Sequence, residues 1–456
     1  MYVISIGSYS RFNLTRRRIS LIALLAAALL RPLPVFAHAK LVSSDPKADT
    51  TLASAPHRIT LVFSETPEPG LSSLKLLGPA GDTMTLSPLR VDSGNASALT
   101  ADVPPGLVPG AYRILWTAAG KDGHPSHGTI AFHVEMTAKR EFTPVVVDNP
   151  PDTDKGPATI AVAGALGSII ARWLAFASCF VLIGVVTFRY LVLGRMTPGE
   201  SQLFSVIASN NAATLGIAAA VGSLLAAMLK LVRESSDMPD ASLVSILQST
   251  WGISLLIQIA AAIVAGIALY YVHRANRGWL AALVATAALA AAPSFAAHAA
   301  SAKASYIAIP TDIVHVIVGG MWLGTLTVIV IVGISAALKT PDTVRPGARV
   351  AHMINIFSPL ALTCGGAVVL TGVGSALLEI PTLHSLWTTP YGVILLLKLF
   401  FVSLLFAAGA WNWKRMKPRL TGDDAIAPMR SSASLELMIA VAVLAVTSIL
   451  VALELP

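Results

Sequence analysis

Eight long apolar stretches constrain this chain more than any other feature of its sequence. They occupy residues 160–187, 204–232, 251–272, 279–297, 313–337, 355–378, 391–411 and 433–453. Each is long enough to cross a bilayer core of about 30 Å at a helical rise of about 1.5 Å per residue. Only 12% of the 456 residues are charged, whereas a soluble globular chain carries about 25%. The sequence therefore predicts an all-α membrane domain of eight transmembrane helices over residues 158–456.

Basic residues in the loops indicate how this domain is oriented. Loops after the odd-numbered stretches carry Arg189, Arg195, Arg274, Arg277, Lys339, Arg345, Arg349, Lys414, Arg415, Lys417, Arg419 and Arg430. Loops after the even-numbered stretches carry few, and there Arg233 is offset by Glu234 and Asp237. Since Lys and Arg are enriched in cytoplasmic loops, the odd-numbered loops are predicted to be cytoplasmic and both the N-terminal region and the C-terminus outside. The net charge of +8 then needs no nucleic acid to explain it.

The first 37 residues have the order of a secretory signal peptide. A basic segment (Arg16–Arg18) precedes an apolar run (19–30) and a cleavage site that ends in Ala37. Cleavage there would make His38 the new N-terminus, so that its α-amine and its imidazole could bind one metal ion together. The paired arginines leave both the general secretory route and twin-arginine export open.

Residues 38–136 are predicted to form a small soluble β domain. Its apolar segments are short and separated by Gly- and Pro-rich turns, which is typical of a β-sandwich or barrel. Strands are expected at 59–63, 73–77, 98–103, 112–116 and 129–134. A linker with Pro and Asp residues (137–157) leads to the membrane domain.

The soluble domain contains nitrogen and oxygen ligands for a metal ion. The only two cysteines, Cys179 and Cys364, lie in the apolar stretches, so no thiolate is available outside the membrane. Asp122 and His124 are two residues apart and point to the same side of an extended segment. Together with His38 they offer an amine, two imidazoles and a carboxylate, a set that suits tetragonal copper(II). Asp-Gly-His alone is more often a structural turn; its combination with an N-terminal histidine is specific.

The soluble domain resembles the CopC family of periplasmic copper-binding proteins. The resemblance is carried by His38-Ala-Lys-Leu41, Ser44-Asp-Pro46, Leu61-Val-Phe-Ser-Glu65, Gly110-Ala-Tyr112-Arg-Ile-Leu-Trp116 and Asp122-Gly-His124-Pro. It implies an immunoglobulin-like Greek-key sandwich in which the His38 amine and side chain, Asp122 and His124 bind copper(II). Glu65 is expected to support these ligands or to bind weakly along the axis.

The soluble domain departs from two-site CopC members because it lacks their methionine cluster. Copper(I) binding by this domain is therefore not expected. His57, His127 and His133 match no site and are expected to be surface residues.

Polar groups gather at the predicted outer end of the membrane domain. His298 ends the fourth stretch, and Asp312 and His315 share one helical face at the start of the fifth, with Met321 about 9 Å deeper. Ionisable groups within spans cost roughly 2.5–3.5 kcal/mol on insertion, so they are functional candidates, with interfacial capping as the alternative. Deeper in the membrane, Lys398 and Glu436 are candidates for a pair, with snorkelling of Lys398 as the alternative.

This region is similar to the CopD family of inner-membrane copper proteins. The similarity is carried by Ser301-Ala-Lys303, Asp312-Ile-Val-His315, Gly320-Met-Trp-Leu-Gly324, Tyr391-Gly-Val-Ile-Leu-Leu-Leu-Lys398 and Asn412. A CopC domain fused to a CopD domain implies copper uptake or resistance at the bacterial inner membrane. The outer domain would capture copper(II), and the membrane domain would move copper inward, with His298, His315, Asp312 and Met321 as candidate path residues and copper(I) as a second candidate species.

Two other functions stay open. The membrane part could anchor a periplasmic copper buffer or sensor, or His298 and His315 could bind haem for electron transfer. An oxidative polysaccharide-cleaving enzyme is disfavoured because Asp122 would fill a position that oxygen needs, so no enzymatic activity is expected. No Walker A motif is present, which argues against ATP-driven pumping. The expected partners are the copper ion and the bilayer, with a periplasmic copper chaperone or a reductase left open.

Overall fold

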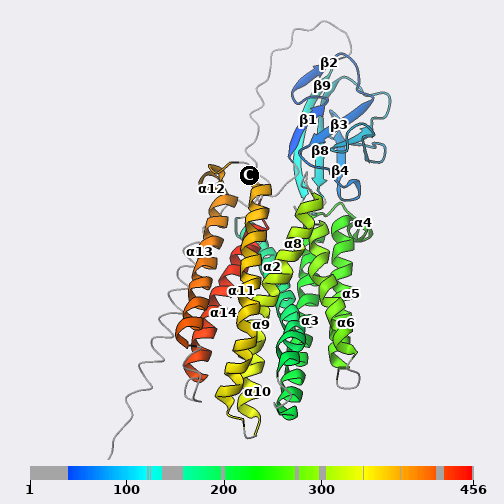
Figure 1. The fold of residues 1–456 in the computed structure, drawn as a ribbon. Helices are drawn as coiled ribbons and strands as arrows, with labels where there is room; N and C mark the ends of the chain where they lie inside the picture. Colours follow the sequence, from blue (N-terminus) through cyan, green and yellow to red (C-terminus); the bar gives the residue numbers. More distant parts are fainter. Residues whose placement is uncertain are drawn as a thin grey trace, which may run out of the picture.

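The protein consists of a β-rich part at one end of a bundle of long helices (Figure 1). The computed structural model describes residues 40–120, 123, 125–135, 158–196, 201–272, 277–296, 305–341, 344–380, 382–416 and 426–453. The predicted signal peptide (1–37) and the whole predicted linker (137–157) lie outside this described part.

The β-rich part is a sandwich of two sheets. Its described strands are β1 (Leu41–Asp45), β2 (Thr50–Leu52), β3 (Arg58–Phe63), β4 (Ser73–Leu77), β5 (Thr83–Met84), β6 (Arg90–Val91), β7 (Ala98–Asp102), β8 (Gly110–Ala119) and β9 (Pro125–Val134). One sheet has the order β1-β3-β7-β6 and the other β2-β9-β8-β4-β5. All five predicted strands are present, and the sandwich prediction is confirmed.

Alternating side chains fill the space between the two sheets. On β3, Ile59, Leu61 and Phe63 are buried, whereas the residues between them are more exposed. On β8, Tyr112 and Ile114 face the same core. This period of two is what a sheet with one buried face requires.

The remainder of the described chain is helical. The helices are α2 (Ala158–Thr187, continued by η2 Phe188–Val192 and η3 Leu193–Arg195), α3 (Gln202–Asp237), α4 (Leu243–Gln248), α5 (Thr250–Tyr270), α6 (Gly278–Ala291, continued by η4 Ala292–Ala296), α8 (Ser305–Gly319), η5 (Gly320–Gly324), α9 (Thr325–Val328), η6 (Ile329–Gly333), α10 (Ile334–Lys339), α11 (Pro346–Glu379), α12 (Ser385–Thr388), α13 (Pro390–Trp411, continued by η7 Asn412–Met416) and α14 (Ile426–Leu450).

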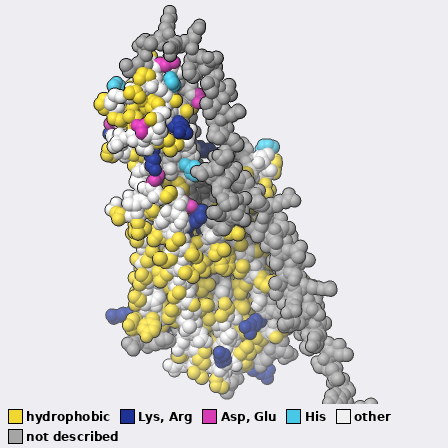
Figure 2. Space-filling model, turned by 180° about the vertical axis from the view of Figure 1, so that it is seen from behind, with side chains coloured by type: hydrophobic (Ala, Val, Ile, Leu, Met, Phe, Trp, Pro, Cys, Tyr) yellow, Lys and Arg dark blue, Asp and Glu magenta, His cyan; other side chains and the backbone are white. Residues whose placement is uncertain are grey.

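Eight of these helical runs are long and apolar enough to span a membrane, which confirms the predicted number. They are 166–195, 202–237, 250–270, 278–296, 306–339, 346–379, 390–415 and 426–450. The space-filling view shows a broad hydrophobic zone around them, with Lys and Arg gathered at the end away from the sandwich (Figure 2). The chain is therefore a multi-pass membrane protein.

The fifth span lies at the centre of the bundle. Of its most apolar window, 72% is buried, against 11% for the seventh span. Its η5 turn touches α2 backbone to backbone: a Cβ on Gly184 would lie 2.1 Å from the carbonyl carbon of Gly324, and one on Gly324 would lie 1.8 Å from the Phe180 carbonyl oxygen. The Gly324 of the predicted motif therefore permits close helix packing.

The sandwich is docked on the ends of α3, α4 and α5. Leu71 and Ala119 of the sandwich share a buried apolar cluster with Met238 and Ile246 of the helical part. Beside this cluster, the Lys75 Nζ lies 2.8 Å from both carboxylate oxygens of Asp240. These contacts fix which face of the sandwich meets the membrane domain.

Candidate functional site

The predicted copper(II) ligands His38, Asp122 and His124 lie outside the described residues. The backbone around them shows where their chain segments run. The Lys40 N–H donates to Ser64 Oγ at 3.0 Å, and the Ser64 N–H donates to the Lys40 carbonyl at 2.8 Å. His38 is two residues before Lys40, at most about 7 Å of chain. Lys40, the first described residue, is therefore held beside the end of β3.

Glu65 connects this end of β3 with the end of β8. Its Oε1 lies 2.7 Å from where a Cβ on Gly120 would be, so the Glu65 carboxylate packs against the Gly120 backbone. The Gly123 N–H donates to the Gly120 carbonyl at 3.1 Å, and Gly123 has a φ of +82°, a left-handed conformation that favours glycine. The two segments that carry the predicted ligands thus converge at one end of the sandwich. Glu65 follows Ser64 in the chain and contacts Gly120, and its supporting role stays a prediction.

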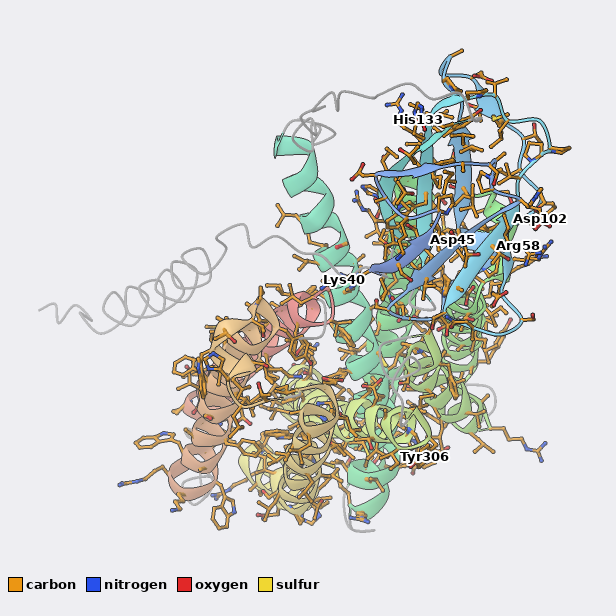
Figure 3. The ribbon with its side chains drawn as sticks, turned by 90° about the horizontal axis from the view of Figure 1, so that it is seen from above. Lys40, Asp45, Arg58, Asp102, His133 and Tyr306 are labelled. Atoms are coloured by element: carbon orange, nitrogen blue, oxygen red, sulfur yellow. The ribbon has the colours of Figure 1, made fainter. Side chains whose placement is uncertain are left out.

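The remaining histidines of the sandwich lie elsewhere. His133 pairs with Ala111 and Thr51 near the far end of β9, ten residues and about 33 Å of strand from Gly123. Seen from above, His133 is well separated from Lys40 (Figure 3). His57 and His127 are exposed. The expected surface position thus holds for His57 and His127, whereas His133 is half-buried.

A second group of predicted residues lies at the sandwich-facing end of the membrane domain. The Ser294 hydroxyl donates to Asp312 Oδ2 at 2.6 Å, and His315 Nδ1 lies 2.8 Å from Thr371 Oγ1. Asp312 is therefore tied to the fourth span and His315 to the sixth. The two side chains have separate partners, and among the described residues no three His, Cys, Asp or Glu side chains gather as a metal site.

Met321 and His298 are the other two residues of the predicted membrane path. Met321 in η5 is half-buried and packs against the main apolar core of the bundle. His298 lies outside the described residues.

The Thr371 hydroxyl oxygen lies 2.8 Å from His315 Nδ1 and 2.7 Å from the Ala367 carbonyl oxygen. Both contacts are hydrogen bonds when the hydroxyl donates to the carbonyl and accepts from His315 Nδ1–H. Nε2 of a neutral His315 then carries the lone pair. A histidine whose Nδ1–H is held in this way is oriented as metal-binding histidines are.

The sequence-based pairing of Lys398 with Glu436 is wrong. Glu436 accepts from Asn412 Nδ2 at 2.8 Å. Lys398 precedes Asn412 by fourteen residues on the same helix, or about 21 Å, and its charge interacts instead with Glu379 and Asp312. The bundle therefore contains two separate polar clusters, one at each end of α13.

Glu234 is a site residue that sequence reasoning missed. It lies in the last turn of α3 with 6% of its surface exposed, and its Oε1 is 2.7 Å from where a Cβ on Gly123 would be. Trp251 Cγ is 2.9 Å from that same position. The apolar stretch ends at residue 232, so the sequence placed Glu234 in an outer loop, as a charge that offsets Arg233. In the structure Glu234 is helical, because α3 extends five residues beyond that stretch. No signal within the sequence links it to Gly123.

The fold defines a polytopic membrane protein with a β-sandwich domain at one end of its helical bundle. Two protein families match parts of the chain: "CopC domain" over residues 41–135 and "Copper resistance protein D" over residues 351–450. The chain thus belongs to the CopC–CopD fusion family, with a CopC domain ahead of a CopD domain. The fusion predicted from the sequence is confirmed.

The chain is also similar to individual proteins. The copper transport protein CutJ of Bacillus subtilis (strain 168) is 26% identical over 415 residues, which are 88% of this chain and 72% of CutJ. Copper resistance protein C of Pseudomonas syringae pv. tomato is 37% identical over 123 residues, 26% of this chain and 97% of that protein. The crystal structure of CopC from Methylosinus trichosporium OB3b has a TM-score of 0.21 and 27% identity, and the match covers 23% of this chain and 100% of that one.

The family matches cover some candidate residues and not others. The CopC match includes Asp122 and His124 and begins three residues after His38. The CopD match comprises α11 to α14. Asp312, His315 and Met321 precede it, so their role rests on the geometry described above.

Proposed function

We propose that this protein captures copper(II) outside a bacterial inner membrane and passes copper inward through its membrane domain. The observation that carries the proposal is the convergence of the two ligand-bearing segments at the end of the sandwich that contacts α3 and α5. Copper bound there would lie at the mouth of the membrane domain. A buffer that only stores copper has no need for this placement.

Capture uses the His38 α-amine and imidazole, Asp122 and His124. An α-amine has a reference pKa near 7.7–8.0 and must lose its proton before it binds a metal. The hard and borderline donors of this set favour copper(II). Signal-peptide cleavage after Ala37 is therefore the step that completes the site.

Transfer then begins at the outer end of the fifth span. His315 offers Nε2, because Thr371 holds its Nδ1. Asp312 adds a carboxylate one helical turn away, and Met321 adds a thioether about 9 Å deeper. A thioether suits copper(I), so copper is reduced before it reaches Met321, by a reductant outside this chain.

The proposed orientation of the protein in the membrane follows from the loop charges. Lys and Arg lie at the end of the bundle opposite the sandwich (Figure 2), which the positive-inside rule assigns to the cytoplasm. The soluble domain and the C-terminus then lie on the periplasmic side.

Copper accumulation in cells tests the proposal. A strain without its own gene receives the wild-type gene, His124→Ala, His315→Ala or, as a matched control, His127→Ala. The proposal predicts that wild type and His127→Ala raise cytosolic copper and that the other two variants do not. Unchanged cytosolic copper with the wild type, together with copper held outside, would identify a tethered buffer instead.

A further inference from the structure

A buried carboxylate lies between α13 and α14, toward the end of the bundle away from the sandwich. Glu436 has 5% of its surface exposed, and its Oε2 accepts a hydrogen bond from Asn412 Nδ2 at 2.8 Å. Asn412 is itself buried, and its Oδ1 accepts from the Ser432 hydroxyl. A Cβ on Gly409 would lie 3.4 Å from Glu436 Oε1. Glu436, Asn412 and Ser432 form the inner polar cluster, around which α13 and α14 run side by side (Figure 1).

Glu436 lies too deep in the bundle to be an interfacial residue. It is ten residues from the start of α14 and fourteen from its end, which are about 15 and 21 Å of helix. The hydrocarbon core of a bilayer is about 30 Å thick, so Glu436 lies within it. A short buried side chain at this depth reaches neither headgroups nor bulk water. Ionisable residues in such positions are costly and typically mark ion or proton pathways.

No cation among the described residues balances the Glu436 carboxylate. The elements packed most closely against α14 are α13, η7, α2, α9 and η6. Together with α14 itself, they carry these other titratable or cationic residues: Arg172, Cys179, Tyr391, Lys398, Lys414, Arg415 and Arg430. Lys414, Arg415 and Arg430 are exposed, and Lys398 interacts with Glu379 and Asp312. Within the described part of the chain, the polar partner of Glu436 is therefore the neutral amide of Asn412.

This environment favours the protonated form of Glu436. An ionised carboxylate that is buried loses more free energy of hydration than one hydrogen bond from an amide returns. The neutral acid keeps the bond to Asn412 and avoids the buried charge. A side chain that only tied α13 to α14 could equally be a glutamine, because an amide oxygen accepts the same hydrogen bond. The ionisable group is therefore more than an interhelical contact requires.

The other polar cluster of α13 lies about 21 Å away along the helix, toward the sandwich. There the charge of Lys398 acts on Asp312 and Glu379, and also on the proposed entry residue His315. Under the proposed function, copper that leaves this cluster approaches Glu436 as a cation. One buried carboxylate compensates one positive charge, because a second cation beside it is repelled by the first. A proton and copper therefore alternate at Glu436.

We propose that Glu436 is the proton-binding group of the membrane domain and that copper entry is exchanged for its proton. The O–H bond of the Glu436 carboxyl breaks as copper approaches, and the proton passes to water on the side of the soluble domain. A proton from the opposite side restores the carboxyl, and no electron moves. The exchange rests on the proposed function, since it names the ion that moves against copper.

The first test detects the proton itself. Infrared spectra of the purified full-length protein are recorded at neutral pH for the wild type, Glu436→Gln and Glu135→Gln, whose exposed carboxylate serves as the matched control. The difference between wild type and Glu436→Gln should contain the carbonyl stretch of a protonated carboxyl, and the difference between wild type and Glu135→Gln should not. A difference spectrum of Glu436→Gln that shows only an ionised carboxylate would overturn the proposal.

The second test measures the exchange in proteoliposomes. Copper and a mild reductant are supplied outside at one fixed pH, which keeps the capture site in one state, while the interior pH is varied. The wild type and Glu135→Gln should take up copper faster into vesicles with an acidic interior, and a protonophore should abolish this acceleration. Uptake by Glu436→Gln should not respond to the interior pH, because its amide binds no proton.

The outcomes separate this inference from the function on which it rests. Uptake by the wild type that ignores the interior pH, or that slows in acidic vesicles, would overturn the exchange while the transport of copper stands. Equal responses of the wild type and Glu436→Gln would overturn the role of Glu436. Absence of uptake by the wild type would overturn the proposed function and the exchange with it, whereas the infrared spectra would still decide whether Glu436 holds a proton.

Discussion

Glu68 of the soluble domain caps the first turn of α5 in the membrane domain, because the Thr250 backbone N–H donates to both of its carboxylate oxygens at 3.1 and 3.2 Å. A carboxylate at a helix N-terminus meets both unpaired N–H groups and the positive end of the helix dipole. The Glu68 N–H in turn donates to the Ala119 carbonyl at 2.8 Å. One residue thus connects the end of β8, near the predicted copper ligands, to a transmembrane helix.

Replacement of Glu68 should loosen this docking. Glu68→Ala removes a charged helix cap, which is worth about 1 kcal/mol, while both domains stay folded. Hydrogen exchange monitored by mass spectrometry should then increase at the first turn of α5 and at the end of β8. Glu135→Ala, exposed at the far end of the sandwich, is the matched control; equal exchange in both variants would contradict the capping role.

Replacement of Gly324 should destabilise the membrane domain. The Cβ of Gly324→Ala would lie 1.8 Å from the Phe180 carbonyl oxygen, so α2 and η5 must separate. Overpacking of this kind costs about 1–3 kcal/mol or more. Thermal unfolding in detergent should show a lower midpoint for Gly324→Ala than for Gly366→Ala, whose new Cβ meets nothing within 4 Å. Equal midpoints would show that the contact between the Gly324 and α2 backbones does not limit the size of the side chain at position 324.

Two ion pairs on the sheet β1-β3-β7-β6 predict that the stability of the soluble domain depends on pH. Arg58 Nε lies 2.9 Å from Asp102 Oδ1, and Arg90 Nη2 lies 2.6 Å from Oδ2 (Figure 3). The Arg58 and Arg90 guanidiniums hold the pKa of the Asp102 carboxyl below its usual value. A carboxyl with a lowered folded-state pKa stabilises the fold above its unfolded pKa, near 3.9, and this stability is lost as pH falls through the folded-state pKa.

Asp102→Asn should therefore weaken the soluble domain at neutral pH but not in strong acid. Exchange of the β3 and β7 amides is compared between variant and wild type at each pH. We expect faster exchange in Asp102→Asn near pH 7 and no difference well below pH 3.9, about the reference value of an aspartate. A difference of the same size at both pH values would show that the ion pairs are not its cause.

An additional residue ahead of His38 should weaken copper(II) binding far more than His127→Ala does. The added residue moves the α-amine away from the His38 imidazole, whereas His127 is an exposed strand residue. Affinity should also fall by up to about tenfold per pH unit below the amine pKa, because one proton must be released. Titration of the processed protein measures both effects. Equal weakening by the two changes would contradict the N-terminal site.

The sequence was sufficient to predict features that repeat along the chain. Eight spans follow from apolar stretches of about 20 residues, and strands such as β3 and β8 follow from alternating side chains. The strand β1 was missed because its sequence, Leu-Val-Ser-Ser-Asp, does not alternate apolar and polar residues. The strands β2, β5 and β6 were missed because they contain only two or three residues. Strands this short have too few positions for an alternating pattern to be recognised.

Contacts between distant segments could not be predicted in the same way. Lys398 and Glu436 are both polar residues in apolar helices, and only the structure shows that they lie near opposite ends of α13. Glu234 contacts Gly123 because the sandwich docks on α3, and neither residue carries a pattern that indicates the other. The composition of the proposed copper site follows from ligand chemistry, whereas the docking of the sandwich on the helices follows from packing.

Uptake of copper by the purified protein in proteoliposomes tests the central claim most directly. Copper and a mild reductant are supplied on the side of the soluble domain, and a copper chelator inside the vesicles reports arrival. The account predicts that the wild type fills the chelator and that His315→Ala binds copper(II) normally at the soluble domain but delivers none. If the wild type binds copper(II) at its soluble domain and the chelator stays empty, the protein holds copper without transporting it, and the account is wrong.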